Sequence, residues 1–326
     1  PPPVAKPAKA RTGPGALDPT FGEGGVITSN PAKTGETEEA TCLSLDSEFL
    51  YVAGVDFSPE NGQWRIEKRQ AQDGTLATGF GEAGVIGSNP SARDDAPVAI
   101  AVNGEAIFIA GNDGGGIPGP VACEFEGLVK NPSWRIEKRM RAYGSVDRSF
   151  GVLGGWTGIV EHDLTCRAFA LDDTSLYFLV SYVGHPDVSY RHPPEEPAQQ
   201  MSMDRWWRID KRLIGSADPA SGFGKMASVR CGFGTGPSDL AAMVAHEGRL
   251  YIAGTEIHRV WTTEVDGKKV RKPLESRWVL ERRDAVTGDL TRGFPMRTDP
   301  TVGVDGLTDM MMSGPLLFIV GRNADR

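Results

Sequence analysis

The hexapeptide WRIEKR occurs at residues 64–69 and again at residues 134–139. Two close variants follow, WRIDKR at 207–212 and WVLERR at 278–283. The tryptophan that opens each motif precedes a phenylalanine by 16 residues in all four cases, at Phe80, Phe150, Phe223 and Phe294. A fixed spacing with matching residues identifies an internal repeat.

Each repeat shows the same order of strand-like segments. A short apolar segment follows the phenylalanine turn, then a second, then a third that is the most hydrophobic, and the tryptophan segment comes last. In the first copy Trp64, Ile66 and Lys68 alternate with charged residues, which indicates an outer strand with one wet face. Four short strands per unit, repeated five times, predict an all-β fold, a five-bladed β-propeller with four antiparallel strands per blade.

The two ends of the chain predict closure of this ring. A further copy of the turn, LDPTFGEGG, contains Phe21, and 16 residues earlier stands Ala5 within residues 4–11. The last unit ends after its third strand, so residues 4–11 are expected to supply its missing outer strand and leave no open edge. The expected blades of this single domain are residues 22–71, 81–141, 151–214, 224–285 and 295–326 with 4–11. The hexapeptide would then form the outer edge of each blade, with its tryptophan packed on the following turn or on the next blade.

The turn LDPTFGEGGV, echoed in GTLATGFGEAGV and GSVDRSFGVLGG, resembles the bacterial delta-60 repeat. In that family a strand ending in glycine leads to an Asp-x-x-Phe-Gly-x-x-Gly turn. The resemblance covers nearly the whole chain in five copies and implies a propeller-like fold, but no reaction, since the family is defined by its repeat. The pattern is broken at Ala77, which replaces the aspartate, and in GDLTRGFPM, which lacks the second glycine.

Insertions separate the third strand from the tryptophan in three repeats. Nine residues intervene in the first unit, against 22, 25 and 23 in the next three. One face of the disc is therefore expected to present long loops and to bind a partner there. The stretch EVDGKKV within the last insertion predicts a hairpin with an Asp-Gly turn. The aromatic residues expected to contact a partner, or alternatively to pack the loops onto the disc, are Phe125, Tyr190, Trp206 and Trp261.

The four cysteines are assigned to that same face. Their positions in neighbouring blades predict two disulfides, Cys42 with Cys123 and Cys166 with Cys231, and hence an oxidising compartment. The alternative is four reduced, buried thiols. No cysteine pair has zinc-motif spacing, and the loop histidines are better explained as solvated residues than as metal ligands, so neither a metal nor a cofactor is expected.

An acidic residue recurs near the start of each second strand, where it would approach the central pore. These residues are Glu39, Asp95, Asp163, Asp239 and Asp309. Two such carboxylates could act as the acid and base of a glycoside hydrolase, or the group could hold a cation. The plainer reading is that acidic residues begin strands in wet loops.

Composition narrows the class of partner. The net charge of −8 argues against nucleic acid, and no apolar run reaches the length of a membrane span. The opening PPPVAKPAKA resembles the start of a processed product and would suit a tether. The resulting hypothesis is a non-catalytic, exported bacterial module in the periplasm, on the outer surface or outside the cell. It would bind a protein partner or belong to a larger cell-surface complex; a carbohydrate-active enzyme is the alternative.

Overall fold

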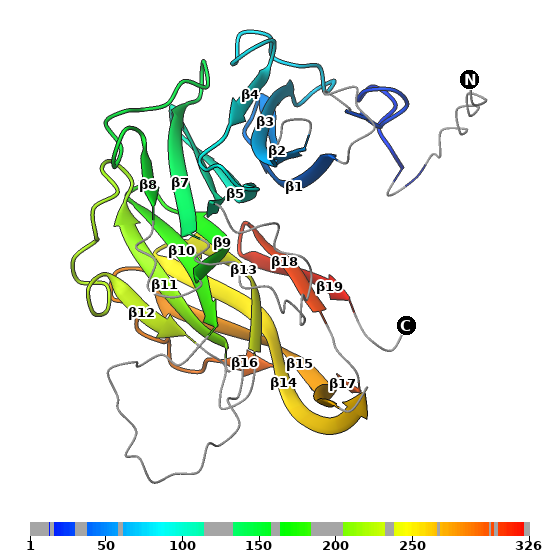
Figure 1. Cartoon of the computed structure of the whole chain (residues 1–326), viewed down its shortest axis with the longest axis vertical. Helices are drawn as coiled ribbons and strands as arrows, with labels where there is room; N and C mark the ends of the chain where they lie inside the picture. Colours follow the sequence, from blue (N-terminus) through cyan, green and yellow to red (C-terminus); the bar gives the residue numbers. More distant parts are fainter. Residues whose placement is uncertain are drawn as a thin grey trace. The chain divides into compact units, whose positions relative to one another are not determined.

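The computed structural model describes residues 13, 16–29, 38–57, 61–113, 133–157, 164–183, 205–231, 238–265, 268–299, 301–302 and 306–322. Every regular element in these ranges is a β-strand, and the strands form antiparallel sheets (Figure 1). The all-β prediction is confirmed at this level. The chain divides into two compact units, residues 1–124 with 136–147 and residues 125–135 with 148–326.

Three sheets have four strands each, paired in chain order. Sheet 1 contains β1 (Glu38–Leu45), β2 (Phe49–Asp56), β3 (Gln63–Gln70) and β4 (Val85–Ser88). Sheet 2 contains β5 (Ala96–Asn103), β6 (Ala106–Asp113), β7 (Ser133–Met140) and β8 (Gly155–Thr157). Sheet 3 contains β9 (Leu164–Leu171), β10 (Ser175–Val183), β11 (Arg205–Leu213) and β12 (Ser228–Cys231).

The last two sheets depart from this pattern. Sheet 4 contains β13 (Ser238–His246), β14 (Arg249–Val265), β15 (Lys268–Asp284), β16 (Met296–Arg297) and β17 (Thr301–Val302), with both short strands paired to β15. Among the described residues, sheet 5 contains β18 (Gly306–Ser313) and β19 (Leu316–Arg322) and no further strand. The expected closing strand, residues 4–11, lies outside the described residues.

The tryptophan strand is the third strand of its sheet, which corrects the expected outer position. In sheet 1, β4 returns after the Phe80 turn and pairs antiparallel with β3, Ser88 opposite Trp64 and Val85 opposite Glu67. The sheets therefore group strands over residues 38–88, 96–157, 164–231, 238–302 and 306–322, one strand later than the expected blades. The reason is that the turn returns the chain beside the free edge of β3, whose backbone groups would otherwise lack partners.

A β-bulge recurs on the first strand of every sheet, and no pattern in the residues predicted it. One extra residue interrupts the register with the second strand in each case, at Thr41, Val98, Arg167, Ala241 and Thr308. A bulge bends its strand and increases the local twist. Its repetition at one position shows that the five sheets are copies of one structural unit.

The repeated tryptophan packs against the following sheet. Trp64 is fully buried in a cluster that includes Ile107 and Ile109 of β6. A Cβ atom added to Gly111 would lie 2.5 Å from Cζ2 of Trp64, and one on Gly321 would lie 2.7 Å from Cζ2 of Trp278. The contact between tryptophan and next sheet is thus confirmed. At these two junctions it requires glycine on the facing strand, whereas Val180 stands at the equivalent place in sheet 3, where Trp134 packs on Phe178.

Hydrogen bonds also join successive turns. The backbone N–H of the glycine after each phenylalanine donates to a carbonyl of the next repeat's turn over 2.9–3.2 Å. The four donor–acceptor pairs are Gly22 with Asp73, Gly81 with Tyr143, Gly151 with Ser216 and Gly224 with Thr287. Pro295 occupies the fifth donor position and has no N–H, so this series ends with the fourth bond.

We expect Gly111→Ala to lower the free energy of unfolding by about 1–3 kcal/mol, because its methyl group would overlap the Trp64 ring. Urea unfolding followed by tryptophan fluorescence measures the change. The control is Gly87→Ala at the exposed glycine of β4, where an added Cβ meets no atom within 4 Å and the expected change is below about 0.5 kcal/mol. Equal effects in the two variants would contradict the packing assignment.

Candidate functional site

The connections that carry the insertions leave the sheets at the end that holds the bulges. The β2–β3 connection is short, whereas those between β6 and β7 and between β10 and β11 lie mostly outside the described residues. In sheet 4 the insertion lengthens β14 and β15 to 17 residues each. Their register ends with Val265 opposite Lys268, which confirms the hairpin predicted around Asp266 and Gly267.

The aromatic residues predicted to bind a partner stay predictions. Phe125 and Tyr190 lie outside the described residues. The backbone of Trp206 pairs with Tyr182 in β10, and that of Trp261 pairs with Lys272 in β15. Both residues therefore stand on strands at the end with the insertions.

The five acidic residues predicted at the pore mouth occupy different positions in their sheets. Positions are counted from the residue just before the bulge. Glu39 and Asp239 stand one residue before it, and Asp95 stands two residues before it. Asp309 stands two residues after it. Asp163 lies outside the described residues. The register therefore gives no ring of equivalent carboxylates.

Two of these carboxylates serve local structure. Buried Asp95 accepts hydrogen bonds from the backbone N–H and the hydroxyl of Ser91, at 3.0 and 2.7 Å. Exposed Asp309 accepts from the N–H of Met310 at 2.7 Å. Among the described residues no group of three histidine, cysteine or acidic side chains could hold a metal ion.

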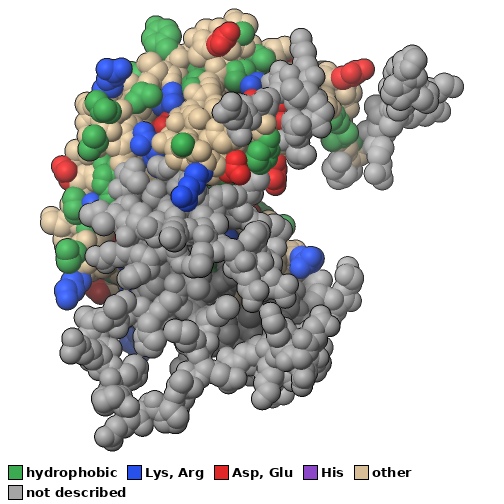
Figure 2. Space-filling view, viewed as in Figure 1, with side chains coloured by type: hydrophobic (Ala, Val, Ile, Leu, Met, Phe, Trp, Pro, Cys, Tyr) green, Lys and Arg blue, Asp and Glu red, His purple; other side chains and the backbone are tan. Residues whose placement is uncertain are grey.

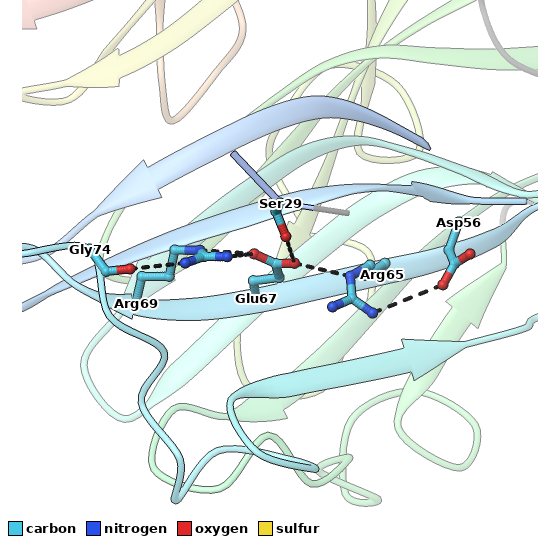
Figure 3. A network of polar contacts seen from close by, with 6 residues as sticks. All are labelled: Ser29, Asp56, Arg65, Glu67, Arg69 and Gly74. Carbon is cyan, nitrogen blue, oxygen red and sulfur yellow. Dashed lines mark hydrogen bonds and ion pairs between the residues drawn. The ribbon is translucent and has the colours of Figure 1, made fainter. Parts of the chain in front are cut away.

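The main polar network lies on the face of the tryptophan strand that was expected to be wet (Figure 3). Arg69 donates through Nε and Nη2 to Oε2 of Glu67, at 2.8 and 2.6 Å, and through Nη1 to the carbonyl of Gly74 at 2.9 Å. Oε1 of Glu67 accepts from Arg65 and from the Ser29 hydroxyl, each at 3.0 Å. Glu67 is only 6% exposed, so the expectation of a wet face was wrong. Charges can be buried there because each has a hydrogen-bonded partner.

The same network recurs in two other repeats. Arg139 binds Glu137 and the carbonyl of Gly144, and Arg283 binds Glu281 and the carbonyl of Gly288. Both glutamates are at most 3% exposed. A fixed arginine–carboxylate pair of this kind holds the third strand to its turn. The carboxylate oxygen that accepts from the arginine thereby has a structural role.

The third repeat is built differently. Its carboxylate, Asp210, pairs with Arg208, and Arg212 instead places its guanidinium carbon 4.2 Å from the ring centre of Trp156. Ala217 stands where the other repeats have the turn glycine, with φ of 66°. An L-residue in that conformation costs about 1–2 kcal/mol, so this turn stores strain that the other repeats avoid.

The lysine of the hexapeptide also has a structural role. Nζ of Lys68 lies 4.0 Å from the ring centre of Phe49 and donates to the carbonyl of Arg141 at 2.9 Å. Lys211 donates in the same way to the carbonyl of Ala285 at 2.8 Å. Burial lowers the pKa of both lysines, and the ring contact and hydrogen bond offset part of that cost. These lysines therefore link neighbouring repeats.

Glu67→Gln tests the buried network through pH. Burial acts to raise the pKa of Glu67, but the hydrogen bonds and charge of Arg69 hold it below its usual value of 4.5. The pair therefore stabilises the fold above that value, and its contribution is lost as pH falls through the lower folded-state pKa. We expect Glu67→Gln to cost about 3 kcal/mol or more at neutral pH and to flatten the decline in stability between about pH 5 and pH 3.

The control for this measurement is Glu82→Gln, which removes an exposed carboxylate in the neighbouring turn. Its urea midpoint should follow that of the unmodified protein across the pH range. A Glu67→Gln protein with unchanged stability at neutral pH would contradict the assignment of a buried ion pair.

The predicted disulfides are not formed. Cys42 and Cys166 are free thiols, and burial raises the pKa of each to about 12. Cys166 lies on β9 and Cys231 on β12, the opposite edges of one sheet. Three interstrand spacings of roughly 4.8 Å separate these strands by about 14 Å, twice the greatest Cα separation that a disulfide bridges. The prediction was wrong because it placed Cys231 in the following blade; Cys123 lies outside the described residues.

We expect alkylation of the unfolded protein, without reductant, to modify Cys166 and Cys231 separately. In the folded protein at mildly alkaline pH, Cys166 should react far more slowly than a free peptide thiol, because a pKa of about 12 leaves little thiolate. Peptide mapping by mass spectrometry measures both. A linked Cys166–Cys231 peptide would contradict the sheet assignment.

One hollow of about 420 Å³ lies beside the turn before β8. It is lined by Arg135, Val152, Leu153, Gly155 and Trp156. Arg212 and Trp134 already contact the Trp156 ring, and the lining holds no acid or nucleophile, so the hollow has no catalytic set. Figure 2 shows acidic, basic and hydrophobic side chains interspersed over the described part of one face.

Comparison with known proteins finds no matching family model and no matching curated protein. In the described ranges no helix is long and apolar enough to cross a membrane.

Proposed function

We propose that this chain is a non-catalytic binding or assembly module built on a closed five-bladed β-propeller. The observation that carries the proposal is that one end of a repeated scaffold carries the insertions. Each of the five sheets has a bulge at the same position, and in three of them the insertion follows the second strand at the bulge end. Repeat scaffolds elaborated at one end commonly bind there. We further propose an exported location, in the periplasm or at the cell surface, with a protein partner or a larger surface complex.

Closure of the ring is supported by the turn at residues 16–29. Gly22 donates to Asp73 and Ser29 to Glu67, just as Gly81 donates to Tyr143 and Ser88 to Glu137 one repeat later. The turn thus behaves toward sheet 1 as the end of a preceding sheet. Within the described residues, sheet 5 has no third or fourth strand. Residues 4–11 and 26–29 would supply both.

Exposed apolar faces on the terminal sheets support the same conclusion. Phe318 and Val320 of β19 are 52% and 59% exposed, whereas the equivalent Tyr51 and Ala53 of β2 are fully buried. On the other terminal sheet, Leu43 is 67% exposed, whereas its equivalents in later sheets are covered by their neighbours. A closed ring would cover both faces.

We expect deletion of residues 1–12 to lower the free energy of unfolding by more than about 2 kcal/mol, since the Phe318 face would lose its cover. Urea unfolding and binding of a hydrophobic fluorescent dye measure the effect. Deletion of residues 324–326 is the matched control and should change neither. A truncated protein as stable as the control would contradict closure by the N-terminal strand.

The binding role is tested by chemical cross-linking of the complex purified under native conditions. Cross-links to a partner should map to residues 114–132, 184–204 and 257–275, at the bulge end of the sheets. Cross-links confined to the turns around Gly74 and Gly144, at the opposite end, would contradict the proposal. So would glycoside turnover that Glu39→Gln or Asp239→Asn abolishes.

A further inference from the structure

Sheet 4 extends into a two-stranded ribbon that the other sheets lack. The ribbon comprises residues 257–265 of β14 and 268–275 of β15, and Figure 1 shows the two strands running on together past their sheet. The pairing of β13 with β14 stops at Ser238 opposite Glu256. Beyond that point, within the described residues, β14 pairs only with β15. Among the described residues, no strand pairs with the backbone donors and acceptors of this outer edge.

The register shows which charges of the ribbon are balanced. Arg259 stands opposite Glu275 and Lys269 opposite Glu264, and opposite charges facing each other across strands stabilise the pairing. Three further basic residues stand opposite uncharged ones: Lys268 opposite Val265, Arg271 opposite Thr262 and Lys272 opposite Trp261. These three are the unbalanced charges of the ribbon. With Asp266 in the connection included, residues 257–275 hold five Lys or Arg against three Asp or Glu, a net charge of +2 in a chain of net charge −8.

The two edges of the ribbon differ in their capacity to accept another strand. The β15 edge contains Pro273, which has no N–H, together with lysines that discourage pairing. The β14 edge between Val260 and Val265 contains no proline and is rich in threonine and valine, which favour strands. An added strand would lie one strand spacing from β14 and two, roughly 10 Å, from the basic residues of β15, about one Debye length.

We propose that the ribbon binds an acidic, extended segment of a partner protein, which adds as a strand to the outer edge of β14. Backbone hydrogen bonds would supply the register and the unbalanced charges the selectivity. The inference rests on the proposed binding function and names the class of partner. A long polyanion such as nucleic acid fits less well, because it would run beyond the ribbon along a chain of net negative charge.

The test uses the full chain and a fluorescein-labelled ten-residue peptide of alternating Glu and Thr. Fluorescence anisotropy at low salt should show binding that weakens as salt rises. A peptide of alternating Glu and Pro has the same charge but cannot pair as a strand, and it should bind at least about tenfold more weakly. Equal binding of the two peptides would overturn strand addition.

The variant K268Q/R271Q/K272Q removes the unbalanced charges and keeps the Lys269–Glu264 pair. We expect it to lose about tenfold or more in affinity for the Glu-Thr peptide. The matched control is R148Q/K225Q/R292Q, which removes three exposed cations elsewhere and should bind as the unmodified protein does. Equal loss in both variants would mean that net charge alone acts and would overturn the proposal.

Two further outcomes separate this inference from the function on which it rests. A heparin-derived decasaccharide that outcompetes the Glu-Thr peptide would identify a polyanion site and overturn the choice of partner. If neither peptide binds, yet native cross-links still map to the bulge end of the sheets, the ribbon proposal fails and the binding function stands.

Discussion

The approach of an indole ring to a backbone without a side chain sets the spacing between neighbouring sheets at two junctions. Trp64 faces Gly111 and Trp278 faces Gly321 so closely that one methyl group would not fit. Burying a tryptophan stabilises by about 4–6 kcal/mol as an upper estimate, whereas each turn-to-turn hydrogen bond contributes about 1 kcal/mol net. The apolar contact is therefore the larger contribution where tryptophan is present, and the hydrogen bonds from Gly81, Gly151 and Gly224 add to it.

The polar face of the tryptophan strand fixes the geometry of the turn more than it stabilises the fold. A buried arginine–carboxylate pair contributes little net free energy relative to an apolar pair of the same volume. It does fix geometry, because Arg69 binds Glu67 within its strand and the carbonyl of Gly74 in the turn. The turn and its sheet are thereby held in one arrangement. A rigid scaffold of this kind leaves variation to the connections, where β14 and β15 have doubled in length.

Local patterns in the sequence predicted what depends on local chemistry. The repeat, the short strands, the tryptophan contact with the next sheet and the hairpin of β14 and β15 all follow from spacing and residue type. The grouping of strands did not, because the segment after Phe80 could pair forward or backward with equal local propensity. The charges of Glu67 and Arg69 indicated a solvent-exposed face. Alternation alone cannot show that the turn before sheet 1 brings Ser29 to Glu67, or that Arg69 binds the carbonyl of Gly74 in the turn after its strand. The cysteine pairing failed with the strand grouping, since Cys231 moved from one sheet to another.

The turn-to-turn hydrogen bonds all run in the same direction along the chain, so the junctions between repeats are not equivalent. Every bond runs from a glycine N–H to the repeat that follows it, and the last position holds Pro295, which can donate nothing. Duplication of an internal unit would preserve donor and acceptor at each new junction. A copy appended after Pro295 would meet a junction without that bond. One imino acid therefore makes the junction after Pro295 the least favourable of these five places for a duplicated unit, because only there would the new neighbour lack this bond.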